Sequence, residues 1–286
     1  MSTSLAYLSA FQRQQLEIAT KIIVHAVHPE KIILFGVYSA GAEAALFTAS
    51  LPAGLRAYDL LVITREADRR SDYELQDIIE NRCRSEVPVT VLVHDISYVN
   101  QRIAEGHYFF SMIREEAIML YDAGKTELVT AGVPDLPRIR MTAQQDFDRW
   151  RRQAWAFFRS AEFNLGQEEW KLAAFLLHQA AEQMYQAILL AFMGYKPTTH
   201  NLDKLRRYTN RFSIELTLLF PRDNEEEDRL FRLLLSGYVD ARYKEDFVIG
   251  RSDIKILTER IRRLLEIAER ICKNRLLNLE KMMAQA

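Results

Sequence analysis

The chain has 286 residues, a length that favours two domains over one. Hydrophobic residues make up 49% and charged residues 27%, a balance that excludes a disordered, fibrous or membrane-embedded chain. The 38 Lys and Arg residues are balanced by 39 Asp and Glu residues, so the net charge of −1 excludes a protein that coats nucleic acid by bulk electrostatics.

The charge differs between the two halves of the chain. Residues 1–140 carry 14 basic and 18 acidic residues, whereas residues 141–286 carry 24 and 21. We therefore expect any polyanion to bind to the second half.

The two cysteines, Cys83 and Cys272, lie far apart in the sequence and inside apolar helical patterns, which is typical of reduced thiols. No leader of basic and then apolar residues begins the chain, and apolar runs such as Ala187–Met193 are too short to cross a bilayer. The sequence predicts a cytoplasmic protein without a membrane partner.

The first half alternates helical and strand-like patterns, as an α/β domain with a mixed sheet does. Short β-branched runs predict its strands, and apolar residues at helical spacing predict its helices. The predicted strands are 31–35, 58–64, 88–93 and 117–121, and the predicted helices are 5–28, 71–84 and 96–113.

The second half reads as helix throughout, so we expect an all-α bundle. Pro134 and Pro137 follow Ala131 and Gly132 and form a cluster typical of a hinge. The predicted domains are therefore residues 1–130 and 143–286, joined by a linker at 131–142. The predicted helices are 143–164, 168–192, 201–207, 214–219, 225–239 and 253–283.

A first candidate site follows the strand at 31–35. Gly36, Ser39 and Gly41 predict a turn whose backbone N–H groups bind phosphate, although a tight connection from strand to helix would use the same residues. Asp59 stands near the start of the next predicted strand, where a carboxylate could hold a divalent metal ion.

Residues 20–125 resemble the minimal nucleotidyltransferase domain of the DNA-polymerase-β-like superfamily. The resemblance is carried by 35–41 (FGVYSAG), 58–62 (YDLLV), the strand at 87–93 and 117–121 (AIMLY). It implies Mg²⁺-dependent nucleotidyl transfer by converging carboxylates. Val37 and Ala40 replace the family's Ser and Arg, Ala57 replaces its first Asp, and the strand at 87–93 offers no carboxylate. We expect a vestigial site, with no cofactor unless the site is active and holds Mg²⁺.

The predicted helix at 168–192 carries a second group of candidates. Gln179, Glu182, Gln183 and Gln186 form one polar stripe, with His178 beside it. The stripe is either a solvated face or the lining of a cleft or dimer interface. Downstream, Thr199 is expected to cap the next helix at its start, where His200 stands as a capping or packing residue or as a catalyst.

Residues 238–247 (YVDARYKEDF) are a third feature of the helical half. Arg242 and Lys244 flank Tyr243, so this segment predicts either a solvated turn or a site where two cations hold a phosphate and a tyrosine stacks on a base. Lys204 and Arg207 are expected to lie nearby.

Residues 143–275 are similar to the HEPN domain, a helical bundle named for nucleotide binding in prokaryotes and higher eukaryotes. The resemblance is carried by 175–183 (FLLHQAAEQ), 196–202 (KPTTHNL) and 241–243 (ARY). It implies a homodimer, and in members that cut RNA it implies an Arg followed within a few residues by a His. Arg242 is present here without that His, so His178 or His200 would have to supply the proton transfer.

The two resemblances together predict a nucleotidyltransferase–HEPN protein, a pairing found among toxins and antitoxins, that binds nucleotide or RNA without catalysis. The alternatives are a metal-independent HEPN ribonuclease, a dimeric scaffold for a protein partner and, last, an active nucleotidyltransferase.

Overall fold

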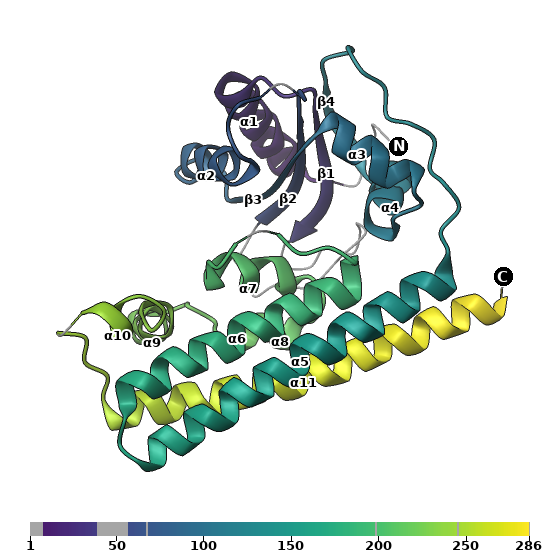
Figure 1. Cartoon of the computed structure of the whole chain (residues 1–286). Coiled ribbons are helices and arrows are strands. Elements are labelled where there is room, and N and C mark those ends of the chain that lie inside the picture. The colour runs from purple at the N-terminus through teal and green to yellow at the C-terminus, as the bar shows by residue number, and fades with distance from the viewer. Residues whose placement is uncertain (1–7, 39–56, 67, 198, 245, 286) are drawn as a thin grey trace. The chain divides into compact units, whose positions relative to one another are not determined.

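The computed structural model describes residues 8–38, 57–66, 68–197, 199–244 and 246–285. The chain forms two compact units, Met1–Asp135 and Leu136–Ala286 (Figure 1).

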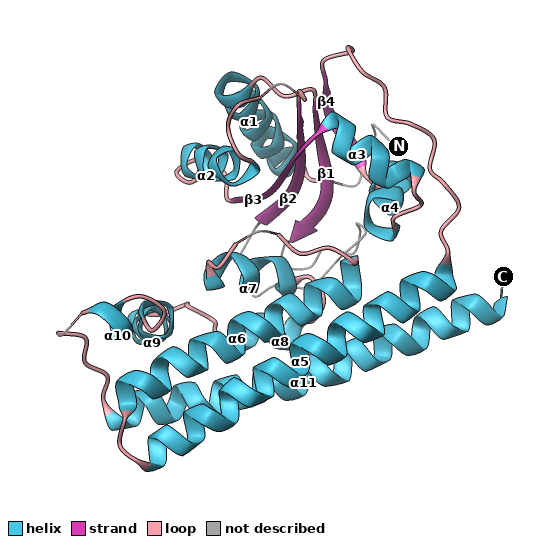
Figure 2. Ribbon diagram, viewed as in Figure 1, coloured by secondary structure: helices cyan, strands magenta, loops and turns pink. Residues whose placement is uncertain are grey.

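The first unit is built on a four-stranded mixed sheet in the order β3-β2-β1-β4 (Figure 2). β1 is antiparallel to both β2 and β4, and β2 is parallel to β3. The parallel pair requires a crossover, which α2 provides. The strands are β1 (Lys31–Tyr38), β2 (Ala57–Thr64), β3 (Val89–Asp95) and β4 (Ile118–Asp122), and the helices are α1 (Ala10–Val27), α2 (Asp72–Cys83), α3 (Ile96–Ala104) and α4 (Tyr108–Glu116).

Helices cover both faces of this sheet. Leu16 and Ile23 of α1 and Ile79 of α2 are buried in one core with the strands. On the other face, Phe109 of α4 packs edge-on against Phe35 of β1, with the ring centroids 5.5 Å apart. Burial on both faces explains why the strands read as nearly continuous apolar runs, and the predicted α/β class with a mixed sheet is confirmed.

The single helix predicted at 96–113 is wrong, because the chain forms α3 and α4 instead. Gly106 lies between them with φ at +66°, a backbone conformation that ends a helix.

The turn predicted at Gly36 is also wrong. β1 continues to Tyr38, so Gly36 lies inside the strand, at a register shift that places it opposite Asp59. A Cβ atom at Gly36 would lie 2.6 Å from Oδ2 of Asp59, which is buried. Gly36 therefore makes room for a carboxylate. Ser39 and Gly41, the other residues of the predicted turn, lie outside the described residues.

The second unit is entirely helical, as the predicted bundle requires. The α6 helix is buried over most of its circumference, and α5 and α11 run beside it (Figure 1). The helices are α5 (Leu136–Gly166), α6 (Trp170–Met193), α7 (Leu202–Asn210), α8 (Ile214–Leu219), α9 (Glu225–Ser236), α10 (Asp240–Tyr243) and α11 (Arg251–Gln285). No helix among the described residues is both long enough and apolar enough to span a membrane.

Several helix boundaries of the second unit differ from those predicted, and two of these differences change how a segment is assigned. α5 begins at Leu136, inside the segment predicted as a linker, because Pro137 stands in the first turn, where its missing N–H would have no partner within the helix. The helix predicted at 225–239 ends at Ser236 in the structure, and the separate turn α10 follows it.

The close contact between Gly36 and Asp59 gives a test of the first unit. We expect Gly36→Ala to lower the free energy of unfolding by about 1–3 kcal/mol, because the added methyl group overlaps the buried carboxylate. Urea unfolding of the single variants and the double variant measures this. Gly36→Ala should lower the free energy of unfolding by less in an Asp59→Ala background than in the wild type. An equal decrease in both backgrounds would contradict the contact.

Candidate functional site

The candidate site surrounds the ring of Tyr238, which follows α9. The ring of His178 stacks on it with centroids 5.1 Å apart, and the ring of His200 lies nearly parallel to it at 6.3 Å. The guanidinium carbon of Arg242 is 4.4 Å from the Tyr238 centroid. The fold thus gathers residues from α6, from the segment before α7 and from α10. We call His178, Glu182, His200, Tyr238 and Arg242 the Tyr238 cluster.

The polar centre of this cluster is Glu182, which is only 3% exposed. Its Oε1 accepts hydrogen bonds from Nδ1 of His200 at 2.9 Å and from Nε2 of Gln186 at 3.3 Å. Its Oε2 accepts from Nε2 of Gln179 at 3.3 Å and lies 3.8 Å from Nε2 of His178. A solvated face is therefore the wrong interpretation for Glu182 and Gln186.

The two histidines have different environments. Nδ1 of His178 donates to the carbonyl oxygen of Leu234 at 3.0 Å. Burial lowers the pKa of His178, and the charges of Arg242 and His200 act in the same direction, against the opposing effects of Leu234 and Glu182. We conclude that His178 is a neutral packing residue at pH 7.

His200, in contrast, has a side chain that is 70% exposed. Nδ1 of His200 is 2.9 Å from Oε1 of Glu182, so this ring nitrogen is engaged by the buried carboxyl group. Nε2 is then left to accept a proton or, in the imidazolium form, to donate one.

Arg242 is exposed, and contacts with the backbone and with aromatic rings fix the orientation of its guanidinium group. Nε donates to the carbonyl oxygen of Tyr238 at 2.6 Å, and the guanidinium also lies 5.1 Å from the Phe175 centroid. Within the described part of the chain, no carboxylate forms an ion pair with Arg242. This arrangement leaves the two Nη atoms available for an anion.

Three further side chains lie on α10 or contact its C-terminal end. Tyr243 is 74% exposed, and its ring centroid is 5.0 Å from the Arg242 guanidinium. Lys244 forms an ion pair with Asp240 at 3.0 Å, which raises the pKa of Lys244. Nζ of Lys171 donates to the carbonyl oxygen of Lys244 at 3.5 Å. No local pattern in the sequence predicts Lys171, because only the packing of α10 against α6 brings it to this turn.

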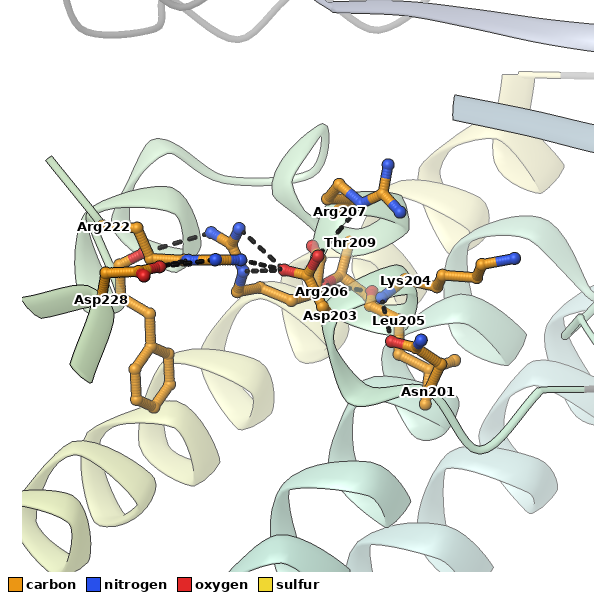
Figure 3. Close-up of polar contacts among 10 residues, drawn as sticks. Asn201, Asp203, Lys204, Leu205, Arg206, Arg207, Thr209, Arg222 and Asp228 are labelled. Atoms are coloured by element: carbon orange, nitrogen blue, oxygen red, sulfur yellow. Dashed lines mark hydrogen bonds and ion pairs between the residues drawn. The ribbon is translucent and has the colours of Figure 1, made fainter. Parts of the chain in front are cut away.

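Lys204 and Arg207 both belong to α7. Figure 3 shows Arg207 in contact with Asp203, whereas the side chain of Lys204 extends away from the row formed by Asp203, Arg206 and Arg222. Nε of Arg207 lies 3.6 Å from Oδ2 of Asp203.

Asp203 is the centre of a separate network that fixes α7. Oδ1 accepts from Nη2 of Arg206 and from Nη1 of Arg222, each at 3.1 Å (Figure 3). Arg206 also donates to the carbonyl oxygen of Phe220 at 3.1 Å, and Arg222 donates to Asp228 at 2.6 Å. Burial opposes ionisation of Asp203, but the surrounding arginines outweigh it and lower the pKa of this carboxyl.

The start of α7 differs from the prediction. The cap is Asn201, whose Oδ1 accepts from the backbone N–H of Lys204 at 3.1 Å, and not Thr199. Thr199 instead accepts from the N–H of Asn201 at 3.1 Å. The cap and the Asp203 network together fix the segment that carries His200.

The Asp203 network gives a prediction with a pH dependence. We expect Asp203→Asn to lower the free energy of unfolding by about 2 kcal/mol at neutral pH, because it removes the charge shared by three arginines. The difference in free energy of unfolding between the wild type and the variant should reach its full value above the ordinary carboxyl pKa of 3.8. It should vanish as the pH falls through the lowered pKa of Asp203. Urea unfolding at several pH values measures it. Asp146→Asn is the control, and a pH-independent difference would contradict the assignment.

The residues around Asp59 in the first unit do not fit a two-metal site. Asp59 lies in register with Gly36 on β1 and with Thr90 on β3. The resemblance would require a further carboxylate on β3, and Thr90 is not one. No group of three or more His, Cys, Asp or Glu side chains among the described residues could hold a metal ion.

Comparison with known proteins identifies the helical unit. Residues 147–273 match the family model of the HEPN domain. No curated protein matches the chain. The chain is similar to a solved structure of a nucleotidyltransferase-like protein from Exiguobacterium sibiricum, with 11% identity, a TM-score of 0.28, and coverage of 96% of this chain and 80% of that one. This match confirms the resemblance to the HEPN domain that residues 175–183, 196–202 and 241–243 carry.

Proposed function

We propose that the HEPN domain binds a nucleotide or RNA at the Tyr238 cluster. The observation that carries the proposal is the exposed guanidinium of Arg242, which is stacked on aromatic rings and has no carboxylate partner among the described residues. A planar guanidinium of this kind binds phosphate oxygens through two parallel N–H donors.

The neighbouring residues complement a nucleotide. The exposed ring of Tyr243 offers a surface on which a base can stack. The ammonium groups of Lys171 and Lys244 add positive charge beside Arg242, although Asp240 neutralises part of it. The site is therefore suited to a phosphate with an attached base more than to a bare anion.

The first unit takes no catalytic part in this proposal. A single described aspartate, Asp59, packs into the space left by Gly36. Two-metal transfer requires converging carboxylates, and Thr90 stands where a further one would be needed. We propose that this unit is a vestigial nucleotidyltransferase domain.

Thermal melting with a panel of nucleotides and a short RNA at low salt tests the binding proposal. Ligand should raise the melting temperature of the wild-type protein by a few degrees, because it binds only the folded state, and Arg242→Ala should abolish the rise. Arg242→Lys should restore only part of it. The exposed Arg263→Ala serves as the control for charge. If no ligand shifts the wild type, or if Arg242→Ala shifts equally, the proposal fails.

A second candidate function is metal-independent cleavage of RNA, which one observation favours. Nδ1 of His200 is held by the buried Glu182, and its exposed ring lies against the same tyrosine as Arg242. Nε2 of His200 can remove the proton from a 2′-hydroxyl, whose oxygen then bonds to phosphorus as the bond from phosphorus to the 5′-oxygen breaks, while Arg242 stabilises the charge that develops on the phosphate. The departing 5′-oxygen takes up a proton from water or from the His200 imidazolium. The histidine that the ribonuclease pattern places after Arg242 would then be supplied from the segment before α7.

Incubating a labelled RNA with the protein and EDTA tests cleavage. We expect His200→Ala to slow it by at least about 100-fold and Glu182→Gln by about 10-fold, because the first change removes the proton acceptor and the second only its support. His25→Ala, an exposed histidine of α1, should cleave at the wild-type rate. Intact RNA with the wild type would remove this function and leave the binding proposal standing.

A further inference from the structure

α5 and α11 are basic helices in a chain that is nearly neutral. α5 holds six arginines and three acidic residues, and α11 holds nine basic and five acidic residues. The chain as a whole has a net charge of −1. The two helices lie side by side (Figure 1), so a large share of the positive charge of the helical unit is concentrated along one pair of elements.

Two adjoining clefts of about 430 and 720 Å³ lie between these helices. They share Arg151 and Glu269 in their walls. We call them together the α5–α11 groove. It lies apart from the Tyr238 cluster, because none of the cluster residues lines either cleft.

The α5 wall of the groove is one continuous face. Arg140, Gln144, Asp148, Arg152 and Trp155 follow one another at intervals of three or four residues, and Arg159 continues the series. At 1.5 Å per residue, this stripe is about 28 Å long. A groove of this length suits an extended chain better than a single small molecule.

Part of the positive charge in the groove is neutralised. Arg151 forms an ion pair with Glu269 at 3.1 Å, and Arg270 forms one with Glu215 at 2.6 Å. Arg140 is paired with Glu280.

Three other cations of the groove have no carboxylate within ion-pair distance among the residues that the structure describes. Arg152 donates only to the backbone carbonyl of Asp148, at 3.3 Å. Arg159 and Lys273 are exposed and line the clefts. These three side chains are available to an anionic ligand.

Trp155 lies among the arginines of the smaller cleft. Its Nε1 donates to Oε1 of Glu269 at 2.6 Å, which fixes the orientation of the indole, and the side chain is only partly buried. An acidic peptide would need the cations but not the ring. Single-stranded nucleic acid uses both, because its phosphates bind cations and its bases stack on aromatic faces.

We propose that single-stranded RNA binds along the α5–α11 groove, with Arg152, Arg159 and Lys273 contacting its phosphates and Trp155 stacking on a base. This is a second site in the helical unit, and it does not depend on ligand binding at the Tyr238 cluster.

Fluorescence anisotropy with a labelled single-stranded RNA of about 20 nucleotides tests the groove. At about 100 mM salt, the double variant Arg152→Ala/Arg159→Ala should bind about tenfold more weakly than the full-length wild type. The slope of log affinity against log salt should become shallower by about 1.4, because each single-strand phosphate contact contributes about 0.7. Trp155→Ala should weaken binding about tenfold, whereas Trp155→Phe, which keeps an aromatic ring, should remain near the wild type.

The double variant Arg263→Ala/Lys281→Ala is the matched control, because it removes the same charge from an exposed face of α11 outside the groove. Its affinity should remain near that of the wild type, and thermal melting should show that all variants are folded. Equal losses in the control and groove variants, or no binding by the wild type, would overturn the proposal. Displacement of the RNA by poly-glutamate at equal charge would also overturn it, in favour of an acidic protein ligand. Arg242→Ala, measured in parallel, separates failure of the groove from failure of the Tyr238 cluster.

Discussion

The carboxyl group of Glu182 lies inside the helical unit, and a buried polar group of this kind is destabilising unless hydrogen-bond partners surround it. Two donors, Gln179 and Gln186, come from its own helix, and the third is His200. Satisfying Glu182 therefore requires the segment before α7 to pack against α6. The same packing sets His200 beside Tyr238, so the geometry of the site follows from the electrostatics of one buried group.

The net charge of the chain conceals two populations of arginine. Arg206 and Arg222 are bound to carboxylates and carbonyl oxygens and serve the packing of α7. Arg242 and Arg159 have no carboxylate partner among the described residues. Arg242 lies next to the exposed ring of Tyr243, and Arg159 lines the same cleft as the partly buried Trp155. A count of charged residues does not separate the arginines that are paired within the fold from those that are not. Only the structure shows which cations remain available to a ligand.

Periodicity in the sequence was enough to predict the four strands and the all-helical second half, because burial on fixed faces leaves a repeating pattern. It failed at Gly36, where an apolar strand followed by small residues also fits a phosphate turn. Local motifs in the sequence were enough to single out His178, His200 and Arg242 as candidates. Their convergence on Tyr238, and the burial of Glu182, were not, because both depend on contacts between residues far apart in the sequence. Lys171 and the α5–α11 groove left no local pattern at all.

α10 is a helix of only four residues, too short to be stable by its own hydrogen bonds. It is held by the stacking of Arg242 on Tyr238 and Phe175 and by the hydrogen bond from Lys171 to its C-terminal end. The groups that would hold a ligand are thus the groups that keep this turn folded. Local unfolding of the turn and occupancy of the site are consequently linked equilibria, and amide hydrogen exchange at residues 240–244 reports on both at once.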